Sequence, residues 1–191
     1  MLPIAEHLQQ AKAPRVQYLA RTLTDLGREI AEGERQIRSD FEGLPEANWI
    51  RSLPGVGDNL APALLACLGR DTERFATPAQ AQAFMGTAPV TKASGRYRKV
   101  SFRHGCWKFA RRTLQLFADL SRHASQWAQN FYQKQRATGH SHHQALRALA
   151  HKWIKVLLAL SRTGKPYSER VYSNSQQAYL LKQTQPRKKL A

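Results

Sequence analysis

A serine beside a glycine lies near the middle of the chain, among basic residues. The segment reads Lys-Ala-Ser-Gly-Arg-Tyr-Arg-Lys over residues 92–99, and Ser94 carries the hydroxyl. A Ser-Gly pair is typical of a tight turn, where the side-chain oxygen can reach solvent or a bound molecule. In phosphoryl transfer, cations stabilise the charge that develops on the phosphate oxygens, and the forked guanidinium of arginine suits this best. The cations near this serine are Lys92, Arg96, Arg98, Lys99 and Arg103.

The same segment allows a second interpretation without catalysis. A Ser-Gly turn with basic neighbours is usually a surface hairpin that contacts phosphate. His104 is close enough in the sequence to act as a base, although a single histidine more often has a structural role. From these residues, a serine nucleophile and a phosphate-binding hairpin both remain open.

A glycine-rich segment, Leu-Pro-Gly-Val-Gly at residues 53–57, is typical of a helix–hairpin–helix. Gly55 and Gly57 would let the backbone turn tightly and approach a phosphate without interference from a Cβ atom. The helix that follows would direct its free N–H groups and positive dipole end at that phosphate. Such contacts position a duplex without reading its sequence. A plain turn between two helices is the alternative.

The histidines and cysteines predict no metal centre. The three histidines within residues 140–143, and His151 after them, lack the spacing of a closed zinc site and have no carboxylate beside them. We therefore expect a helix start with solvated imidazoles there. Cys67 and Cys106 are far apart in the sequence and form no ligand spacing, so we expect reduced, buried thiols.

The elements that position these segments are predicted to be helical. Residues 15–42 form one long helix, in which apolar residues recur at alternating steps of three and four, as in the seam of a coiled coil. These seam residues are Val16, Leu19, Leu23, Leu26, Ile30 and Ile37. So narrow a stripe predicts packing against a partner helix, from another chain or from a segment outside this sequence. Packing onto the chain's own core is the alternative.

Helical patterns continue on both sides of the serine segment. A Thr-Pro pair predicts a helix start at Thr77, and Gly86 predicts its end. Helical periodicity is lost between Thr87 and Phe102, which predicts a strand–turn–strand or an ordered loop. Three further helices are expected within residues 105–164, the last of them ending at its glycine.

The fold class predicted from these patterns is mainly α. Residues 46–172 would form a helical domain that contains a helix–hairpin–helix and a small β-hairpin or loop insert. A long coiled-coil-like helix within residues 1–45 would precede it. Residues 173–191 are polar and basic, and we expect a disordered tail there.

Charge is distributed very unevenly along the chain. Lys and Arg number 30 against 13 Asp and Glu, a net charge of +17. Residues 1–73 contain 8 basic and 11 acidic side chains, whereas residues 74–191 contain 22 basic and 2 acidic ones. A polyanion is the natural partner of such a surface, and nucleic acid is the first candidate. Lys108, Arg111 and Arg112 would add phosphate contacts to those of the serine segment.

The positive charge is also compatible with a membrane surface or with no specific partner. An anionic membrane surface would favour one basic amphipathic helix, but here the charge extends over several elements. A merely soluble basic protein, such as a ribosomal type, also fits the composition. No apolar run is long enough to span a bilayer, and residues 1–14 lack a secretory signal, so we expect a cytoplasmic protein.

The ordered series of motifs resembles one known family. The series comprises Pro-Gly-Val-Gly at 54–57, Phe-Ala-Thr-Pro at 75–78, Phe-Met-Gly-Thr-Ala-Pro at 84–89, Ser-Gly at 94–95, a basic run, Gly105, Arg-Arg at 111–112 and Gly-Lys-Pro-Tyr at 164–167. It is similar to the C-terminal domain of the bridge-RNA-guided DEDD insertion-sequence transposases, a group that includes the pilin-gene invertases. The resemblance covers roughly residues 50–168.

The resemblance implies a role for Ser94 as a nucleophile that attacks a DNA phosphodiester and holds the strand as a phosphoserine. In that family, an N-terminal resolvase-like domain carries three Asp and one Glu for a divalent metal such as Mg²⁺. A coiled-coil region joins that domain to the serine-bearing one, and residues 15–42 would match its end. The implied partners are double-stranded DNA, a guide RNA and further copies of the chain through the N-terminal helix. The implied location is the bacterial nucleoid.

The sequence departs from the family pattern in having no plausible metal quartet. We therefore expect a fragment without the acidic domain, whether a truncated gene product, a mis-annotated start or an isolated domain. Such a fragment would hold no cofactor itself and would cleave strands only when joined to that domain. The alternative function is a non-catalytic DNA- or RNA-binding module that uses the helix–hairpin–helix and the basic helices, including a scaffold for a guide RNA.

Overall fold

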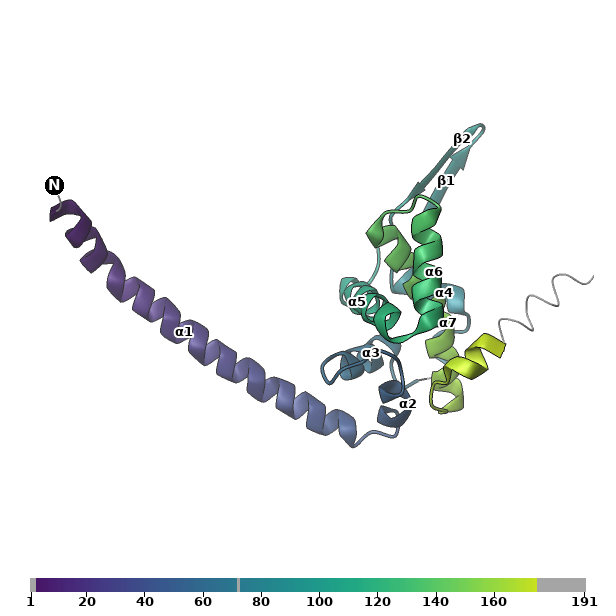
Figure 1. Ribbon diagram of the computed structural model, residues 1–191, viewed down its shortest axis with the longest axis horizontal. Coiled ribbons are helices and arrows are strands. Elements are labelled where there is room, and N and C mark those ends of the chain that lie inside the picture. Colours follow the sequence, from purple (N-terminus) through teal and green to yellow (C-terminus); the bar gives the residue numbers. More distant parts are fainter. Residues whose placement is uncertain (1–2, 72, 175–191) are drawn as a thin grey trace, which may run out of the picture. The chain divides into compact units, whose positions relative to one another are not determined.

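A computed structural model describes residues 3–71 and 73–174, without the side chains of residues 3–10 and of Arg98. The fold is mainly helical, with one small antiparallel hairpin and a long N-terminal helix (Figure 1), which confirms the predicted fold class. The chain divides into two compact units, Met1–Gly43 and Leu44–Ala191. All but the first two residues of the predicted tail, 173–191, lie outside the described residues.

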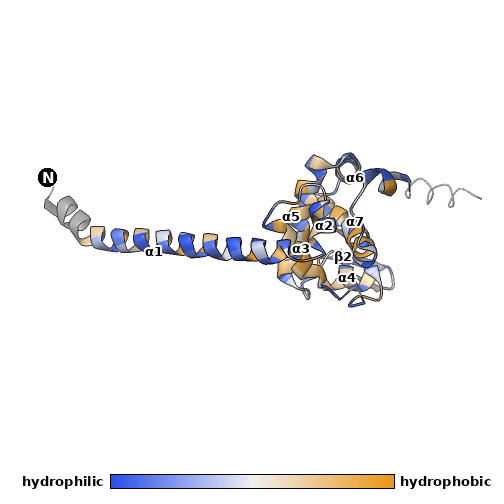
Figure 2. Ribbon diagram, turned by 90° about the horizontal axis from the view of Figure 1, so that it is seen from below, coloured by the Kyte–Doolittle hydropathy of each residue, from blue (hydrophilic) through white to orange (hydrophobic). Residues whose placement is uncertain are grey.

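The first unit consists of helix α1, Pro3–Glu42. The helix begins earlier than the predicted residue 15 because Pro14 lies inside it instead of preceding it. A proline removes only its own N–H from the helix ladder, and an exposed helix can bend to relieve its contact with the preceding turn. Polar and apolar residues alternate along the helix (Figure 2). The seam is exposed within this unit, from 48% at Leu26 to 69% at Leu23.

The second unit contains the remaining helices and the hairpin. In chain order its elements are α2 (Ala47–Arg51), α3 (Leu60–Leu68), α4 (Pro78–Phe84), β1 (Val90–Ser94), β2 (Tyr97–Ser101), α5 (Lys108–Ala124), α6 (Gln126–Ala137) and α7 (His142–Thr163). Helices α5, α6 and α7 pack against one another, and α3 packs on α5, α2 on α3 and α4 on α7. The hairpin extends away from these helices (Figure 1).

The centre of this unit is an aromatic cluster around Trp153 of α7. Its fully buried ring lies 4.9 Å from the ring of Phe117 and 4.6 Å from that of Trp127. Its indole N–H donates to the hydroxyl of Ser121 at 2.8 Å, so the buried donor is satisfied. Each large apolar side chain buried in this way contributes about 1.5–3 kcal/mol. Helix α7 therefore supplies the centre of the core through the period of three and four in its sequence.

The helix ends follow local sequence signals. Thr77 caps α4 in a capping box with Gln80, with proline at the first helical position, as predicted. Ser141 and Gln144 form the same motif at the start of α7, where the histidine cluster predicted a helix start. Gly164 ends α7 with φ +63°, a left-handed conformation that favours glycine. These local signals therefore determine where α4 and α7 begin and where α7 ends.

Candidate nucleic-acid interface

Ser94 lies at the tip of the hairpin. Strands β1 and β2 pair in antiparallel register, and Gly95 and Arg96 connect them. Gly95 has φ +54°, and a Cβ atom added there would meet nothing within 4 Å. Conformation, not crowding, therefore requires glycine beside Ser94. The strand–turn–strand expected from the sequence is confirmed.

The strand register decides which side chains share a face with Ser94. Ser94 pairs with Tyr97, and Lys92 pairs with Lys99. Cross-strand partners lie on the same face, and so do residues two apart on one strand, about 6.7 Å away. The hydroxyl, the phenol and two ammonium groups therefore lie on one face of the ribbon, and all four side chains are exposed. Arg98 pairs with Ala93, and its side chain is outside the described part.

No base is positioned to activate Ser94. Among residues 3–71 and 73–174, its hydroxyl makes no hydrogen bond to a carboxylate or an imidazole. The His104 ring instead packs edge-on against Phe102, with the ring centroids 5.3 Å apart. A serine hydroxyl is a weak nucleophile without an adjacent base. The hairpin alone thus presents a hydroxyl with cations but no complete catalytic set.

Two of the predicted DNA-binding arginines form part of the root of the hairpin. Arg103 donates through Nε to the carbonyl of Ala88 at 3.2 Å, and its own carbonyl accepts from the Arg111 guanidinium at 3.3 Å. The Arg111 guanidinium also lies 4.5 Å from the centroid of the Phe102 ring. Both side chains are half-buried. They therefore brace the start of α5 against the hairpin, and only part of each can contact a ligand.

Gly86 explains how Arg111 is held. It has φ +71°, and a Cβ atom there would lie 2.5 Å from the Cys106 sulfur and 3.2 Å from Cδ of Arg111. The end of α4 therefore packs directly against the start of α5. Cys106 is half-buried, unlike the fully buried Cys67, whose pKa burial raises to about 11. The expectation of two buried thiols is thus wrong for Cys106, because it lies at this contact between two helix ends.

Arg147 is a cation of this region that the sequence analysis missed. It lies on α7, and its guanidinium is 5.2 Å from the centroid of the same Phe102 ring that Arg111 contacts. Burial lowers the pKa of Arg147, and the charge of Arg111 lowers it further. A signal was present in the sequence, because His143, Arg147 and His151 recur at every fourth residue and so share one helix face.

Lys108 and Arg112 occupy an exposed face at the start of α5. They are four residues apart and both exposed, as phosphate contacts require. In the part of the chain that the structure describes, neither forms an ion pair with an acidic residue. The structure thus brings these two cations near the root of the hairpin and leaves their charge available.

The glycine turn lies between α2 and α3, as expected, but its two glycines differ. Gly55 has φ +73°, and a Cβ atom there would lie 2.8 Å from the carbonyl of Leu120 in α5. Packing against α5 therefore explains this glycine. Gly57 is exposed, has open space around its Cα, and its carbonyl accepts from the N–H groups of Leu60 and Ala61 at the start of α3. Packing therefore leaves only the glycine at position 57 unexplained.

The glycine turn and the hairpin root contact different parts of α5. Leu120 and Lys108 are separated by roughly 18 Å along the helix axis, at ~1.5 Å per residue. The structure therefore does not gather all the predicted residues into one site. A helix–hairpin–helix contact at Gly57 would hold a different stretch of nucleic acid from the one at Ser94.

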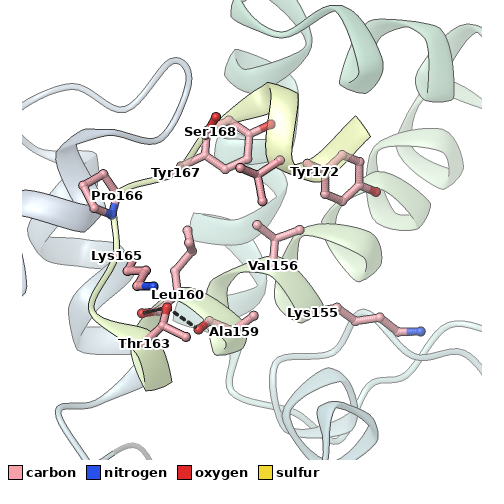
Figure 3. Close-up of a pocket in the computed structure, with 11 residues that line it drawn as sticks. Lys155, Val156, Ala159, Leu160, Thr163, Lys165, Pro166, Tyr167, Ser168 and Tyr172 are labelled. Atoms are coloured by element: carbon pink, nitrogen blue, oxygen red, sulfur yellow. Dashed lines mark hydrogen bonds between the residues drawn. The ribbon is translucent and has the colours of Figure 1, made fainter. Parts of the chain in front are cut away.

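An apolar groove of about 450 Å³ lies between α7 and residues 165–172. Figure 3 shows Val156 and Leu160 from α7 facing Tyr167 and Tyr172 from the segment that follows it. Burial raises the pKa of both tyrosines, and the Tyr167 hydroxyl accepts from the indole of Trp127 at 2.6 Å. Its lining contains no carboxylate or imidazole, so this groove offers no acid–base pair.

The described residues form neither a metal centre nor a membrane span. Within that part of the chain, no group of three or more His, Cys, Asp or Glu side chains could hold a metal ion. Tyr132 and His142 instead contact each other, with the phenol oxygen 2.8 Å from the imidazole Nδ1. None of the described helices has the length and apolarity to cross a membrane.

The family model and the relatives that match this chain agree with one another. Residues 47–133 match the family model described as "Transposase IS116/IS110/IS902 family". The chain is 35% identical over 156 residues to the insertion element IS110 uncharacterized 43.6 kDa protein of Streptomyces coelicolor, covering 80% of this chain and 38% of the relative. It is 32% identical over 162 residues to the insertion element IS900 uncharacterized 42 kDa protein of Mycobacterium paratuberculosis, covering 83% and 40%.

A third relative is the mini-circle putative transposase for IS117 of Streptomyces coelicolor. It is 28% identical over 135 residues, which cover 71% of this chain and 33% of the relative. The chain thus spans about two fifths or less of the length of the curated relatives it matches.

Proposed function

The chain carries a transposase domain of the IS116/IS110/IS902 family over residues 47–133, and on this premise we propose that it binds DNA and that Ser94 is the nucleophile of strand cleavage. The homologues support a role in transposition. The observation that carries the nucleophile assignment is the exposed hydroxyl of Ser94 on the same ribbon face as Lys92 and Lys99. A hydroxyl at the tip of a projecting hairpin can meet a DNA backbone without rearrangement of the helices.

The proposed reaction is a transesterification. The Ser94 oxygen attacks the phosphorus of one phosphodiester, and the O–P bond to one of the two flanking sugars breaks. The serine proton goes to a base, and the leaving sugar oxygen takes up a proton. The product is a phosphoserine ester that retains the energy of the broken bond, so a sugar hydroxyl from a second strand can reverse the step. Lys92 and Lys99 would stabilise the charge on the non-bridging oxygens.

The base is expected from outside the surroundings of Ser94, since no carboxylate or imidazole among the described residues forms a hydrogen bond with its hydroxyl. In the family that the motifs resemble, an acidic domain with three Asp and one Glu would hold Mg²⁺, which supplies Lewis-acid assistance to phosphate chemistry. We propose that the present domain acts with such a domain, on the same or on another polypeptide. The contribution of this chain is then to bind DNA and to present the hydroxyl.

Two partners are proposed besides DNA. The exposed seam of α1 supports association with a second copy of the chain, because such a stripe gains stability by packing against a like helix. The basic surface of the second unit is also suitable for a guide RNA. Binding to structured RNA and to duplex DNA, compared at several salt concentrations, ranks the two nucleic acids.

The nucleophile is tested by Ser94→Ala in a cellular recombination assay that supplies the acidic domain. We expect recombination to fall more than about 10³-fold, since loss of a nucleophile has effects of that size or larger. The affinity for DNA should change less than about twofold. The matched control is Thr91→Ala, which removes an exposed hydroxyl from the opposite face of the same hairpin.

A denaturing gel should also show a covalent protein–DNA adduct that releases phosphoserine on hydrolysis. Normal recombination by Ser94→Ala would show that the nucleophile assignment is wrong. It would favour the second candidate function, a non-catalytic nucleic-acid-binding module. The observation that favours this second candidate is that, among the described residues, the Ser94 hydroxyl has no hydrogen bond to a carboxylate or an imidazole.

A further inference from the structure

A second groove lies between the root of the hairpin and helices α6 and α7. Its volume is about 790 Å³, within the usual range of ligand pockets. The hairpin side is formed by Thr87, Pro89, Val100, Ser101 and Phe102, and the helix side by residues that include Phe131, His140, His143, Arg147, His151 and Lys152. Ser94 does not line this groove, so the groove is distinct from the exposed hairpin tip.

The lining of the groove is basic and contains no acidic residue. Arg147 and Lys152 are cations, and three histidines join them. Both acidic residues of the segment 74–191 are engaged elsewhere. Asp119 pairs with Arg122 at 2.7 Å, and Glu169 accepts from the backbone N–H of Trp127 at 3.2 Å. The groove therefore has a positive charge that this half of the chain does not neutralise.

Arg147 is the cation of this groove that lies beside a second arginine. It is half-buried and shares the Phe102 ring with Arg111, so two like charges are held close together. Among the described residues, no carboxylate or carbonyl accepts a hydrogen bond from its guanidinium. A partly buried cation without such partners is costly, and an anion that binds it offsets the cost. Contact with the Phe102 ring compensates only in part.

The groove borders the root of the hairpin whose tip carries Ser94. From Ser94 at the tip to Val90 at the root, β1 spans roughly 13 Å at ~3.3 Å per residue. One strand of B-DNA advances ~3.4 Å per nucleotide along the helix axis, and its phosphates also wind around that axis, so this length corresponds to at most about four nucleotide steps. A strand whose phosphate meets Ser94 can thus run along the ribbon and place another phosphate at the groove.

We propose that the groove around Arg147 binds a phosphodiester of the DNA strand that Ser94 attacks, within about four nucleotide steps of the cleaved phosphate. Arg147 supplies the charged hydrogen bonds, and Lys152 adds charge from the next turn of α7. The groove acts as an anchor, because Phe102 and α7 fix Arg147 while the hairpin tip remains exposed. This inference rests on the proposed function, because it places the strand that Ser94 attacks, but the affinity of the Arg147 groove for DNA can be measured without cleavage.

The test compares Arg147→Gln with Arg170→Gln in the 191-residue chain. Both variants remove one positive charge, but Arg170 is exposed and does not line the groove. The probe is a fluorescein-labelled duplex of about 20 base pairs, followed by anisotropy at about 100 mM salt. We expect the Kd to rise about tenfold for Arg147→Gln, because this variant loses hydrogen bonds between a cation and a phosphate. For Arg170→Gln we expect a rise of less than about twofold, because salt screens an exposed surface charge.

A second variant guards against a folding defect. Lys152→Gln leaves Phe102 untouched and should raise the Kd about threefold, with a thermal melting curve like that of the unaltered chain. On a substrate whose cleaved phosphate is mapped through the Ser94 adduct, a neutral methylphosphonate is placed in turn at each phosphate within about four steps. At one of these positions it should weaken binding by the unaltered chain but not by Arg147→Gln.

Equal losses for Arg147→Gln and Arg170→Gln would overturn the proposal, since general electrostatics would then account for both. The proposal would also be overturned if Arg147→Gln lost affinity for structured RNA but not for the DNA duplex. Failure of the Ser94→Ala prediction has a different signature, because recombination by that variant would then stay normal while the loss of affinity in Arg147→Gln would remain.

Discussion

Ser94 and Arg147 differ in how tightly the protein holds them. Ser94 is exposed at a hairpin tip, whereas Arg147 is half-buried against Phe102. A reacting group must approach and leave a phosphate, but a positioning group acts best when its rotamers are already restricted. The two side chains are thus suited to the roles that we propose for them at the two ends of one hairpin.

The glycines of the turn between α2 and α3 also have separate roles. At position 55, a side chain would strain a positive φ and collide with the α5 backbone. At position 57 it would meet open space. A loss of DNA binding on substitution of Gly55 would therefore report on packing, and only substitution of Gly57 tests contact with phosphate.

His151 should make folding sensitive to acid. Burial, and after it the charges of Lys155 and Lys152, lower the pKa of His151 from its ordinary value of 6.5. Its Nδ1 faces the Thr87 hydroxyl at 3.4 Å, and its carbonyl accepts from Gln82. Because the unfolded state takes up this proton first, the free energy of unfolding should fall as the pH drops below 6.5, until the lowered pKa of the folded state is passed.

Urea unfolding at a series of pH values between neutrality and mild acid measures this effect. The variant His151→Gln should show a flatter dependence on pH than the unaltered chain. His123→Gln is the control, because that imidazole is exposed on α5. Equal pH dependence in His151→Gln and the unaltered chain would contradict the assignment.

At the scale of elements, the hairpin strands and the seam of α1 are both exposed within their own units, among the described residues. Strands β1 and β2 pair only with each other in the described structure, and all the described side chains of residues 91–100 are exposed. A two-stranded ribbon of this kind is only marginally stable alone. Contact with DNA would therefore order the element that carries Ser94 as well as position it.

The seam of α1 predicts self-association. Leu23→Glu places a charge in the seam, and we expect it to shift the chain towards the monomer, since a buried carboxylate is strongly disfavoured. Thr24→Glu adds the same charge one residue along, outside the seam, and should leave the assembly unchanged. Size-exclusion chromatography with light scattering measures the mass. A monomeric unaltered chain at high concentration would contradict the prediction.

At the scale of the whole molecule, charge should govern affinity. Residues 74–191 hold 22 basic side chains against 2 acidic ones. If about six of the predicted cations neutralise phosphates, the affinity for duplex DNA should fall about 10³-fold between about 50 and 200 mM salt, a log–log slope of about −5. Anisotropy titrations at a series of salt concentrations measure the slope. A slope shallower than about −1 would show that the basic surface does not bind the backbone.

The sequence by itself determined the features that depend on near neighbours. Thr77 and Pro78 start α4 because a capping box closes within four residues. Gly164 ends α7, and the Ser-Gly pair turns the hairpin, because glycine adopts a positive φ without strain. The period of α7 and the basic excess of the second half are likewise properties of the chain itself. The role of Ser94 stays a prediction.

Only the tertiary structure decided which distant residues meet. Arg147 and Arg111 share one aromatic ring because α5 and α7 pack together, and no local pattern contains that contact. The backbone of Leu120 likewise sets the need for glycine at position 55. Helix ends depend on hydrogen bonds over a few residues, whereas contacts between distant residues depend on how whole helices pack. The packing of the hairpin root against α6 and α7 therefore created the basic groove.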